Sequence, residues 1–141
     1  GDMDGDGNLD IVVANRGSNN VSVLRNNGNA VFTLVASYSV GSLPSSVAVG
    51  DVDGDSDLDV VVTNEFSYSL SVLRNKGNGT FTSEGEYAAG SSPVFVALGD
   101  VNGDGYLDVA VANYYGNSAS ILLNQTPFLG PFAPPSLFVA R

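Results

Sequence analysis

Short apolar runs rich in valine and leucine recur along the chain, separated by clusters of glycine, asparagine and serine. One such run is VSVL at residues 21–24. In the longer segment 32–40, apolar side chains occupy every second position: Phe32, Leu34, Ala36, Tyr38 and Val40. A period of two is that of a pleated strand with two different faces. The pattern therefore predicts an all-β chain of short strands.

The whole pattern repeats every 49 residues. Residues 2–50 and 51–99 align without a gap and are identical at 26 of 49 positions, and a third copy starts at Asp100. The register is lost after Asn124, where the segment 125–141 holds four of the six prolines. We therefore divide residues 1–124 into repeats 2–50, 51–99 and 100–124. We interpret 125–141 as a Pro-rich C-terminal tail or linker, with 136–140 as a candidate strand.

Each repeat has the pattern of four antiparallel strands. In the second repeat these are predicted at 47–51, 59–63, 70–74 and 81–87, and the Asn- and Gly-containing segments 25–29 and 74–78 are predicted hairpin turns. Four short strands at such a period are typical of a β-propeller blade. We expect about three blades, the first lacking its inner strand and the third lacking its outer strand unless the tail supplies it.

Three blades do not close a ring, because closed propellers have at least about four. An open stack leaves strand edges and apolar faces exposed. We therefore expect further propeller blades in a parent chain, or assembly by self-association, and favour the parent chain.

Composition excludes several classes of function. Fifteen acidic residues against five basic ones give a net charge of −10, which leaves no positive surface for nucleic acid. Cysteine and histidine are both absent, which removes disulfides, zinc sites of the Cys/His type and catalytic pairs that need either residue. No apolar run is long enough for a membrane span.

The acidity is concentrated in three nine-residue loops. All twelve aspartates lie in the windows 2–10, 51–59 and 100–108, at positions 1, 3, 5 and 9 and, in the second window, also at position 7. The side chains at positions 1, 3, 5 and 9 are Asp2, Asp4, Asp6 and Asp10; Asp51, Asp53, Asp55 and Asp59; and Asp100, Asn102, Asp104 and Asp108.

Converging carboxylates need a cation. Two unit charges about 4 Å apart near a surface repel by roughly 4 kcal/mol at an effective dielectric constant of about 20. Calcium fits because it takes six to eight oxygen ligands in flexible geometry. The alternative, aspartate used as a turn or capping residue, explains one or two residues per loop but not three loops in register. An EF-hand is excluded because its position-12 glutamate is replaced by valines inside strands: Val13, Val62 and Val111.

The segments GDMDGDGNLDIVVAN, GDVDGDSDLDVVVTN and GDVNGDGYLDVAVAN resemble the FG-GAP/VCBS repeats of integrin-α-type β-propellers, and the likeness covers residues 1–124. The resemblance implies that each loop joins the innermost strand of a blade to the next strand. It also implies up to three structural Ca²⁺ ions, held by the side chains at positions 1, 3, 5 and 9 and by the main-chain oxygen at position 7. The residues at position 7 are Asn8, Asp57 and Tyr106.

Three departures from the loop pattern qualify this expectation. Ser56 stands at position 6, where the other loops have glycine, and a positive φ there would cost on the order of 1 kcal/mol. Asn102 leaves the third loop with one carboxylate fewer, so we expect weaker attraction for the ion. The first loop starts at Asp2 without the strand that precedes the others, so we expect the first site to be frayed or empty.

We expect no catalysis from these residues, since the chain has one lysine, Lys76, and its aspartates are assigned to calcium. The resemblance implies a non-catalytic, extracellular or cell-surface module that serves as an adhesion or ligand-binding platform, for a protein or carbohydrate ligand. The alternative is an ancillary propeller of a larger secreted hydrolase or carbohydrate-binding lectin. Millimolar extracellular calcium suits such loops.

Four aromatic residues follow the second strand of the second and third blades and form a candidate recognition surface, with packing between blades as the alternative: Phe66, Tyr68, Tyr114 and Tyr115. Arg25 and Arg74 share a phase beside the hairpins, and we interpret them as surface or turn residues.

Overall fold

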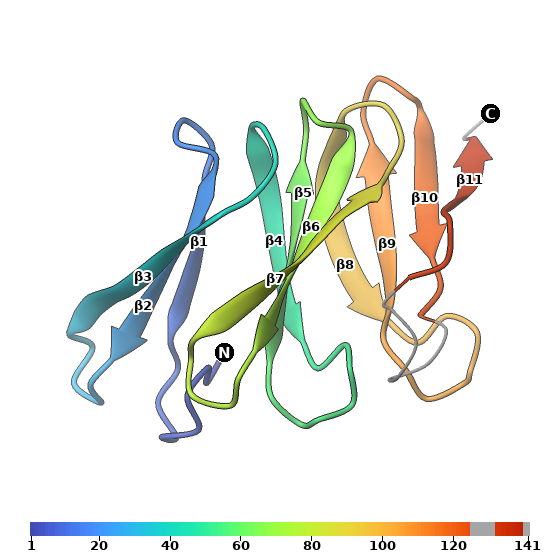
Figure 1. The fold of residues 1–141 in the computed structure, drawn as a ribbon. Coiled ribbons are helices and arrows are strands. Elements are labelled where there is room, and N and C mark those ends of the chain that lie inside the picture. The colour runs from blue at the N-terminus through green and yellow to red at the C-terminus, as the bar shows by residue number, and fades with distance from the viewer. Residues whose placement is uncertain (125–131, 140–141) are drawn as a thin grey trace.

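The computed structural model describes residues 1–124 and 132–139, which form eleven strands in three antiparallel sheets (Figure 1). The first sheet contains β1 (Ile11–Asn15), β2 (Asn20–Asn26) and β3 (Phe32–Ser39). The second contains β4 (Pro44–Gly50), β5 (Asp59–Asn64), β6 (Ser69–Asn75) and β7 (Phe81–Ala88). The third contains β8 (Pro93–Gly99), β9 (Asp108–Asn113), β10 (Ser118–Leu122) and β11 (Ser136–Val139).

Strands adjacent in sequence are neighbours in each sheet, as expected of propeller blades. The second and third sheets have four strands and the first has three, and the described sheets do not close into a ring. The prediction of an all-β, partial propeller with antiparallel blades is confirmed. We call the sheets blades A, B and C in chain order.

The strand boundaries differ from the sequence prediction mainly at the inner strand. We predicted 47–51, whereas β4 begins at Pro44 and ends at Gly50. Proline lacks an N–H but is tolerated as the first residue of a strand. The register shifts next to Pro44 and again between Val72 and Leu73, and blade A has the equivalent shift between Val23 and Leu24.

The core lies between the blades. Val60 and Val62 of β5 pack with Val21 and Val23 of blade A, while Val61 belongs to the cluster between blades B and C. Because both faces of β5 are covered, every residue of this strand is buried. Burying a valine completely contributes about 1.5 to 3 kcal/mol, so the uninterrupted apolar run of β5 is a direct consequence of its central place.

The two ends of the stack are built differently. In blade A, Gly1 takes the last position of the missing inner strand, since its carbonyl accepts the N–H of Asp10 at 2.7 Å. The equivalent pairs in blades B and C are Gly50 with Asp59 and Gly99 with Asp108. In blade C, β11 pairs with β10 as an outer strand, so the tail contributes a structured element. The rest of the predicted linker, residues 125–131 and 140–141, lies outside the described residues.

Within residues 1–124 and 132–139, no helix has the length and apolar character needed to cross a membrane.

Candidate metal centres

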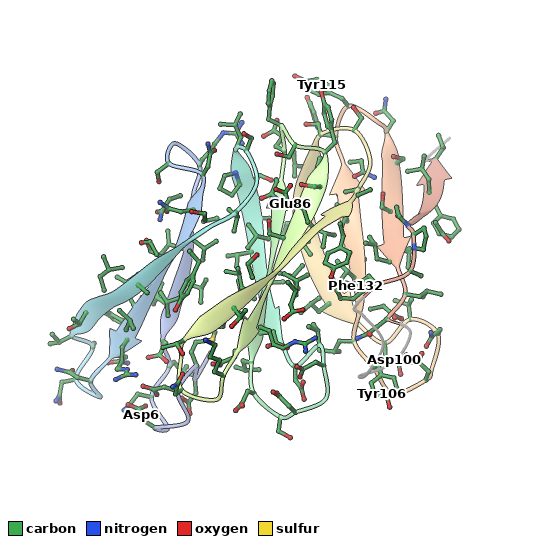
Figure 2. All side chains as sticks on the ribbon, viewed as in Figure 1. Asp6, Glu86, Asp100, Tyr106, Tyr115 and Phe132 are labelled. Atoms are coloured by element: carbon green, nitrogen blue, oxygen red, sulfur yellow. The ribbon has the colours of Figure 1, made fainter. Side chains whose placement is uncertain are left out.

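The three aspartate loops lie at one end of the stack of blades. Figure 2 shows Asp6 in the first loop and Asp100 and Tyr106 in the third at this end, with Tyr115 at the opposite end. In blades B and C, the loop connects the inner strand to the second strand, joining β4 to β5 and β8 to β9. This is the position that the resemblance implied.

The first aspartate of each loop shapes the turn. In the first loop, the carboxylate of Asp2 accepts the N–H groups of Gly5 and Gly7, both at 2.9 Å. Asp51 accepts the equivalent N–H groups of Gly54 and Ser56, and Asp100 those of Gly103 and Gly105, at 2.7 to 2.9 Å. The loop that starts at Asp2 therefore has the same hydrogen-bonded turn as the others and is not frayed.

The aspartate at position 9 connects the loop to the sheet. It is buried in all three loops. One oxygen accepts the N–H at position 2, and the other accepts the N–H of an asparagine at or just beyond the C-terminal end of β2, β6 or β10. In blade B, Asp59 accepts from Val52 at 3.0 Å and from Asn75 at 2.8 Å. Asp10 and Asp108 make the same two contacts, with Met3 and Asn26 and with Val101 and Asn124.

Three carboxylates converge in each of the first two loops. Ligand oxygens of Asp2, Asp4 and Asp10 lie within 4.8 Å of one another, and so do those of Asp51, Asp53 and Asp59. These are positions 1, 3 and 9 of the predicted set. The position-5 residues Asp6 and Asp55 lie outside these groups and instead accept the N–H of the position-7 residues Asn8 and Asp57, at 2.8 and 2.9 Å.

The third loop repeats the backbone hydrogen bonds with an amide at position 3. Asn102 donates from Nδ2 to Asp104 at 2.8 Å, and Asp104 accepts the N–H of Tyr106 at 2.9 Å. The carboxylates of Asp100 and Asp108 keep the contacts of their counterparts in the other loops.

Ser56 has the backbone conformation that the sequence comparison raised as a source of strain. Its φ is 77°, beside 87° for Gly7 and 91° for Gly105 at the equivalent positions. A residue with a Cβ is strained in this left-handed region, whereas glycine is not. The second loop therefore carries a local cost that the first and third avoid.

Burial raises the pKa of two carboxyl groups in the second loop, those of Asp59 and Asp53. Burial raises the pKa of Asp59 to about 6, although the N–H groups of Asn75 and Val52 lower it. Burial also raises the pKa of Asp53. By contrast, the backbone N–H of Asn8 holds the pKa of the solvent-exposed Asp6 low. A divalent cation would offset the cost of burying Asp59, and a donor set made only of oxygens fits calcium.

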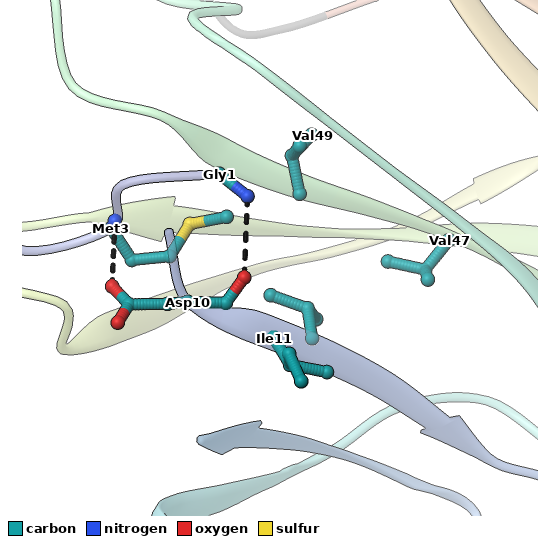
Figure 3. Close-up of a pocket in the computed structure, with 7 residues that line it drawn as sticks. Gly1, Met3, Asp10, Ile11, Val47 and Val49 are labelled. Carbon is teal, nitrogen blue, oxygen red and sulfur yellow. Dashed lines mark hydrogen bonds between the residues drawn. The ribbon is translucent and has the colours of Figure 1, made fainter. Parts of the chain in front are cut away.

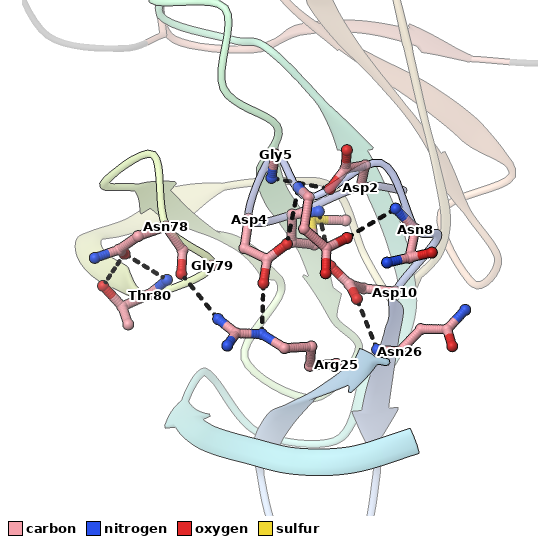
Figure 4. Close-up of polar contacts among 12 residues, drawn as sticks. Asp2, Asp4, Gly5, Asn8, Asp10, Arg25, Asn26, Asn78, Gly79 and Thr80 are labelled. Atoms are coloured by element: carbon pink, nitrogen blue, oxygen red, sulfur yellow. Dashed lines mark hydrogen bonds and ion pairs between the residues drawn. The ribbon is translucent and has the colours of Figure 1, made fainter. Parts of the chain in front are cut away.

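Two arginines provide part of the compensation, and the sequence interpretation of them as turn residues missed this role. Arg74 Nε lies 2.9 Å from an oxygen of Asp53, and Arg25 Nε contacts Asp4 in the same way (Figure 4). Arg25 also donates to the carbonyl of Asn78 in blade B at 3.5 Å. Both arginines therefore pair with the carboxylate at position 3.

The third repeat replaces both partners of this pair together. It has Asn102 at position 3 and Leu123 at the arginine position. Four carboxylates with one arginine give the first loop a net charge of −3, and three carboxylates without arginine give the third loop the same charge. We expected the third loop to attract the ion more weakly because we counted its carboxylates and left out the arginine that pairs with one of them in the other loops. The joint replacement across repeats was the sequence signal that would have revealed the pair.

A surface pocket of about 310 Å³ lies where blade A lacks its inner strand. Figure 3 shows it between β1 and β4. Its lining is apolar apart from the backbone and Asp10, whose two carboxylate oxygens already accept backbone N–H groups: Gly1, Met3, Asp10, Ile11, Val12, Val47 and Val49. The pocket thus lies beside β1, on the side where β4 and β8 pair with the corresponding strands of blades B and C.

The four candidate recognition residues are exposed. They lie in the turns between β5 and β6 and between β9 and β10, which Figure 1 shows at the opposite end of the stack from the aspartate loops. Tyr114 and Tyr115 form an edge-to-face pair with centroids 5.1 Å apart. Their exposure argues against the alternative of packing between blades.

Comparisons with known proteins bear on the repeat and on the fold. The sequence profile described as "FG-GAP-like repeat" matches residues 2–62 and 51–111. No significant match was found among curated protein sequences.

A similar fold occurs in a solved structure of the Photorhabdus luminescens Tc holotoxin pore. The two chains are 21% identical, the TM-score is 0.51, and the alignment covers 94% of this chain and 6% of that one. This chain therefore spans a small part of the length of the toxin chain.

The two profile matches overlap and together cover residues 2–111, which include all three loops, and this confirms the resemblance seen in the sequence. The chain belongs to the FG-GAP-like repeat family.

Proposed function

We propose that this chain is a non-catalytic, calcium-binding part of a larger β-propeller protein, in which the propeller is an extracellular platform for binding a ligand. The observation that carries the proposal is the convergence of Asp51, Asp53 and Asp59 within 4.8 Å, with Asp59 fully buried. The short stretch of the toxin chain that shares this fold supports an ancillary place in a longer chain.

Calcium in these loops has a structural role in this account. When bound, the ion would neutralise the carboxylates at positions 1, 3, 5 and 9 and would take the carbonyl at position 7. The chain's own residues already prepare the site, because Asp59 ties the loop to β6 through Asn75 and Asp51 holds the turn. Ion binding would then lock the connection between β4 and β5.

Calcium binding is best tested by isothermal titration of the chelator-treated protein. We expect more than one ion per chain, and we expect Asp51→Asn to remove one of them. Asp57→Asn is the matched control, because it makes the same change of charge in the same loop at a position whose main-chain oxygen, not its side chain, is the proposed ligand. Equal calcium binding by both variants, or no binding by the unaltered protein, would contradict the proposal.

A second candidate function is carbohydrate recognition by an ancillary propeller, and the exposed pair of Tyr114 and Tyr115 favours it. Aromatic faces supply large apolar contact area with a polar edge, which suits a binding surface. Binding to a glycan array that is lost in the Tyr114→Ala and Tyr115→Ala double variant would support it. An array without binding, beside capture of a protein ligand that needs the same two tyrosines, would favour the adhesion platform.

A further inference from the structure

One buried asparagine side chain joins the aspartate loops of blades A and B. Asn75 is the last residue of β6. Its Nδ2 donates to the carbonyl of Met3 in the first loop at 2.8 Å and to the carbonyl of Leu58 in the second loop at 3.0 Å. Its main-chain N–H donates to the carboxylate of Asp59, at position 9 of the second loop, at 2.8 Å. A single residue therefore holds groups of two loops.

Asn124 makes the same set of contacts between blades B and C. It is buried, and its Nδ2 donates to the carbonyl of Val52 in the second loop at 2.6 Å and to that of Leu107 in the third loop at 3.2 Å. Its main-chain N–H donates to the carboxylate of Asp108 at 2.8 Å. The contact therefore occurs at both junctions between the described blades, at equivalent positions of the repeat.

These hydrogen bonds continue from the first loop to the third. The position-2 residue provides the connection, because its N–H donates to the position-9 aspartate of its own loop while its carbonyl accepts the asparagine amide of the following blade. In the second loop, Val52 donates to Asp59 at 3.0 Å and accepts from Asn124. Met3 makes the equivalent two bonds in the first loop. Hydrogen bonds in a low-dielectric interior are stronger than in water and polarise one another, so this buried run links the three loops firmly.

The linked groups lie among the candidate calcium ligands. Val52, at position 2, stands between Asp51 and Asp53. An ion held by these two aspartates would fix the main chain of Val52 and, through it, the amide of Asn124 in the following blade. The loop of that blade then has less freedom to lose when it binds its own ion. A second ligand that meets an already ordered protein binds more tightly, which is positive cooperativity.

We propose, on the basis of the calcium binding proposed above, that the calcium sites of adjacent blades are coupled. Asn75 joins the first site to the second, and Asn124 joins the second to the third. Filling one site raises the calcium affinity of its neighbour. Coupling between two sites is typically about 5- to 150-fold and is reciprocal, so each site changes the affinity of the other by the same factor. The two asparagines are thus positioning residues that act on two sites each.

Nuclear magnetic resonance offers one reporter for each site. The position-4 glycines Gly5, Gly54 and Gly103 donate their N–H groups to the position-1 aspartates of their loops at 2.7 to 2.9 Å. Calcium titration followed at these three resonances measures the affinity of each site separately. Asp51→Asn should empty the second site and weaken calcium binding at the first and third by about fivefold or more, although neither of those loops is altered. Asp57→Asn makes the same change of charge with the ligand side chains intact, and should leave both affinities unchanged.

Removing one amide at a time assigns the coupling to its residue. Asn75→Ala should abolish the effect of Asp51→Asn on the first site and keep its effect on the third, and Asn124→Ala should do the reverse. Asn26→Ala is the matched control. Within the described part of the chain, Asn26 Nδ2 donates to the carbonyl of Leu9 in its own loop and to no other blade, so this variant should keep both effects. A general loss of stability would not produce this pattern.

Independent sites would overturn the proposal. If all three sites bind calcium and emptying the second changes neither neighbour, the coupling is absent while the proposed calcium binding stands. The proposal also fails if Asn75→Ala keeps the effect on the first site as Asn26→Ala does. Absence of calcium binding at all three glycines would contradict the proposed function, and the coupling with it. If an alanine variant does not fold, the comparison of Asp51→Asn with Asp57→Asn still decides, since both junctions are intact in these proteins.

Discussion

At the scale of single residues, each loop depends on an aspartate that serves two strands at once. Asp59 is fully buried and accepts one N–H from the loop and one from the end of β6. A buried carboxylate that is hydrogen-bonded but not neutralised remains costly, because burial disfavours its charged form. Two nearby residues are therefore informative about how the loop tolerates this cost: Ser56, which replaces the glycine of the other loops, and Arg74, which pairs with Asp53.

Ser56→Gly should stabilise the protein. The serine is held at a φ of 77°, and relief of this strain, reduced by the greater freedom of glycine in the unfolded chain, should add about 0.5 to 1 kcal/mol to the free energy of unfolding. Denaturant titration of both proteins in calcium measures the difference. Ser56→Ala is the control, since it keeps the strain and should give no gain; equal stabilisation by alanine would show that the backbone is not the cause.

Glu65 provides a pH-dependent link between all three blades. Its carboxylate pairs with Arg16 of blade A and accepts a hydrogen bond from Ser92, next to β8, at 3.1 Å. The bond from Arg16 holds the pKa of Glu65 below its ordinary value of 4.5. A carboxyl with a lowered folded-state pKa contributes stability above its unfolded-state pKa, and this contribution disappears as the pH falls through the folded-state pKa.

Glu65→Gln should therefore lower stability at pH 7 and have no such effect once the pH is below the lowered pKa of Glu65. The loss should be under about 1 kcal/mol, because Arg16 is half exposed and solvent screens the pair. Denaturation midpoints of both proteins across this pH range provide the test. A difference that is the same at every pH would mean that the charge of Glu65 is not what links the blades.

At the scale of elements, the arginine at the start of the hairpin turn, Arg25 or Arg74, and the carboxylate at position 3 act as one unit. Arg74→Leu gives the second repeat the leucine that the third repeat has at this position, Leu123. The substitution should increase calcium affinity at the second loop because it removes a competing positive charge from Asp53. It should also destabilise the protein without calcium, since Asp53 then loses its counter-charge.

Calorimetric titration of Arg74→Leu and Arg74→Lys separates charge from packing. The lysine variant keeps the charge and should retain the original affinity. If the leucine variant binds calcium no more tightly than the lysine variant, the arginine does not compete with the ion.

Most of the elements follow from the sequence because they depend on local patterns. The period of two and the Asn-Gly turns locate the strands, and the spacing of the aspartates locates the loops, since each of these signals lies within about ten residues. The pairs Arg25–Asp4 and Arg74–Asp53 join residues 21 apart on different strands or loops, so no local pattern contains them. The pairing of β11 with β10 likewise did not follow from the sequence, because apolar and polar side chains hardly alternate in residues 136–140.

At the scale of the whole molecule, stability comes from the junctions between blades. Each described blade buries its side chains against its neighbour and has no core of its own, which is the behaviour of a repeat protein. The aspartate loops sit at the same end of all three blades (Figure 1). Leu58 of the second loop and Leu107 of the third pack against the apolar clusters between blades. Calcium bound in the loops would thus support the contacts between blades as well as the strands within them.

Thermal unfolding followed by circular dichroism, with about 5 mM calcium and then with excess chelator, tests this account most directly. Each site occupied at about 100 times its dissociation constant adds roughly 2.7 kcal/mol to the free energy of unfolding, so calcium should raise the melting temperature substantially. Magnesium at the same concentration should raise it less, because it requires stricter octahedral geometry. Identical melting curves with calcium and with chelator would contradict the account.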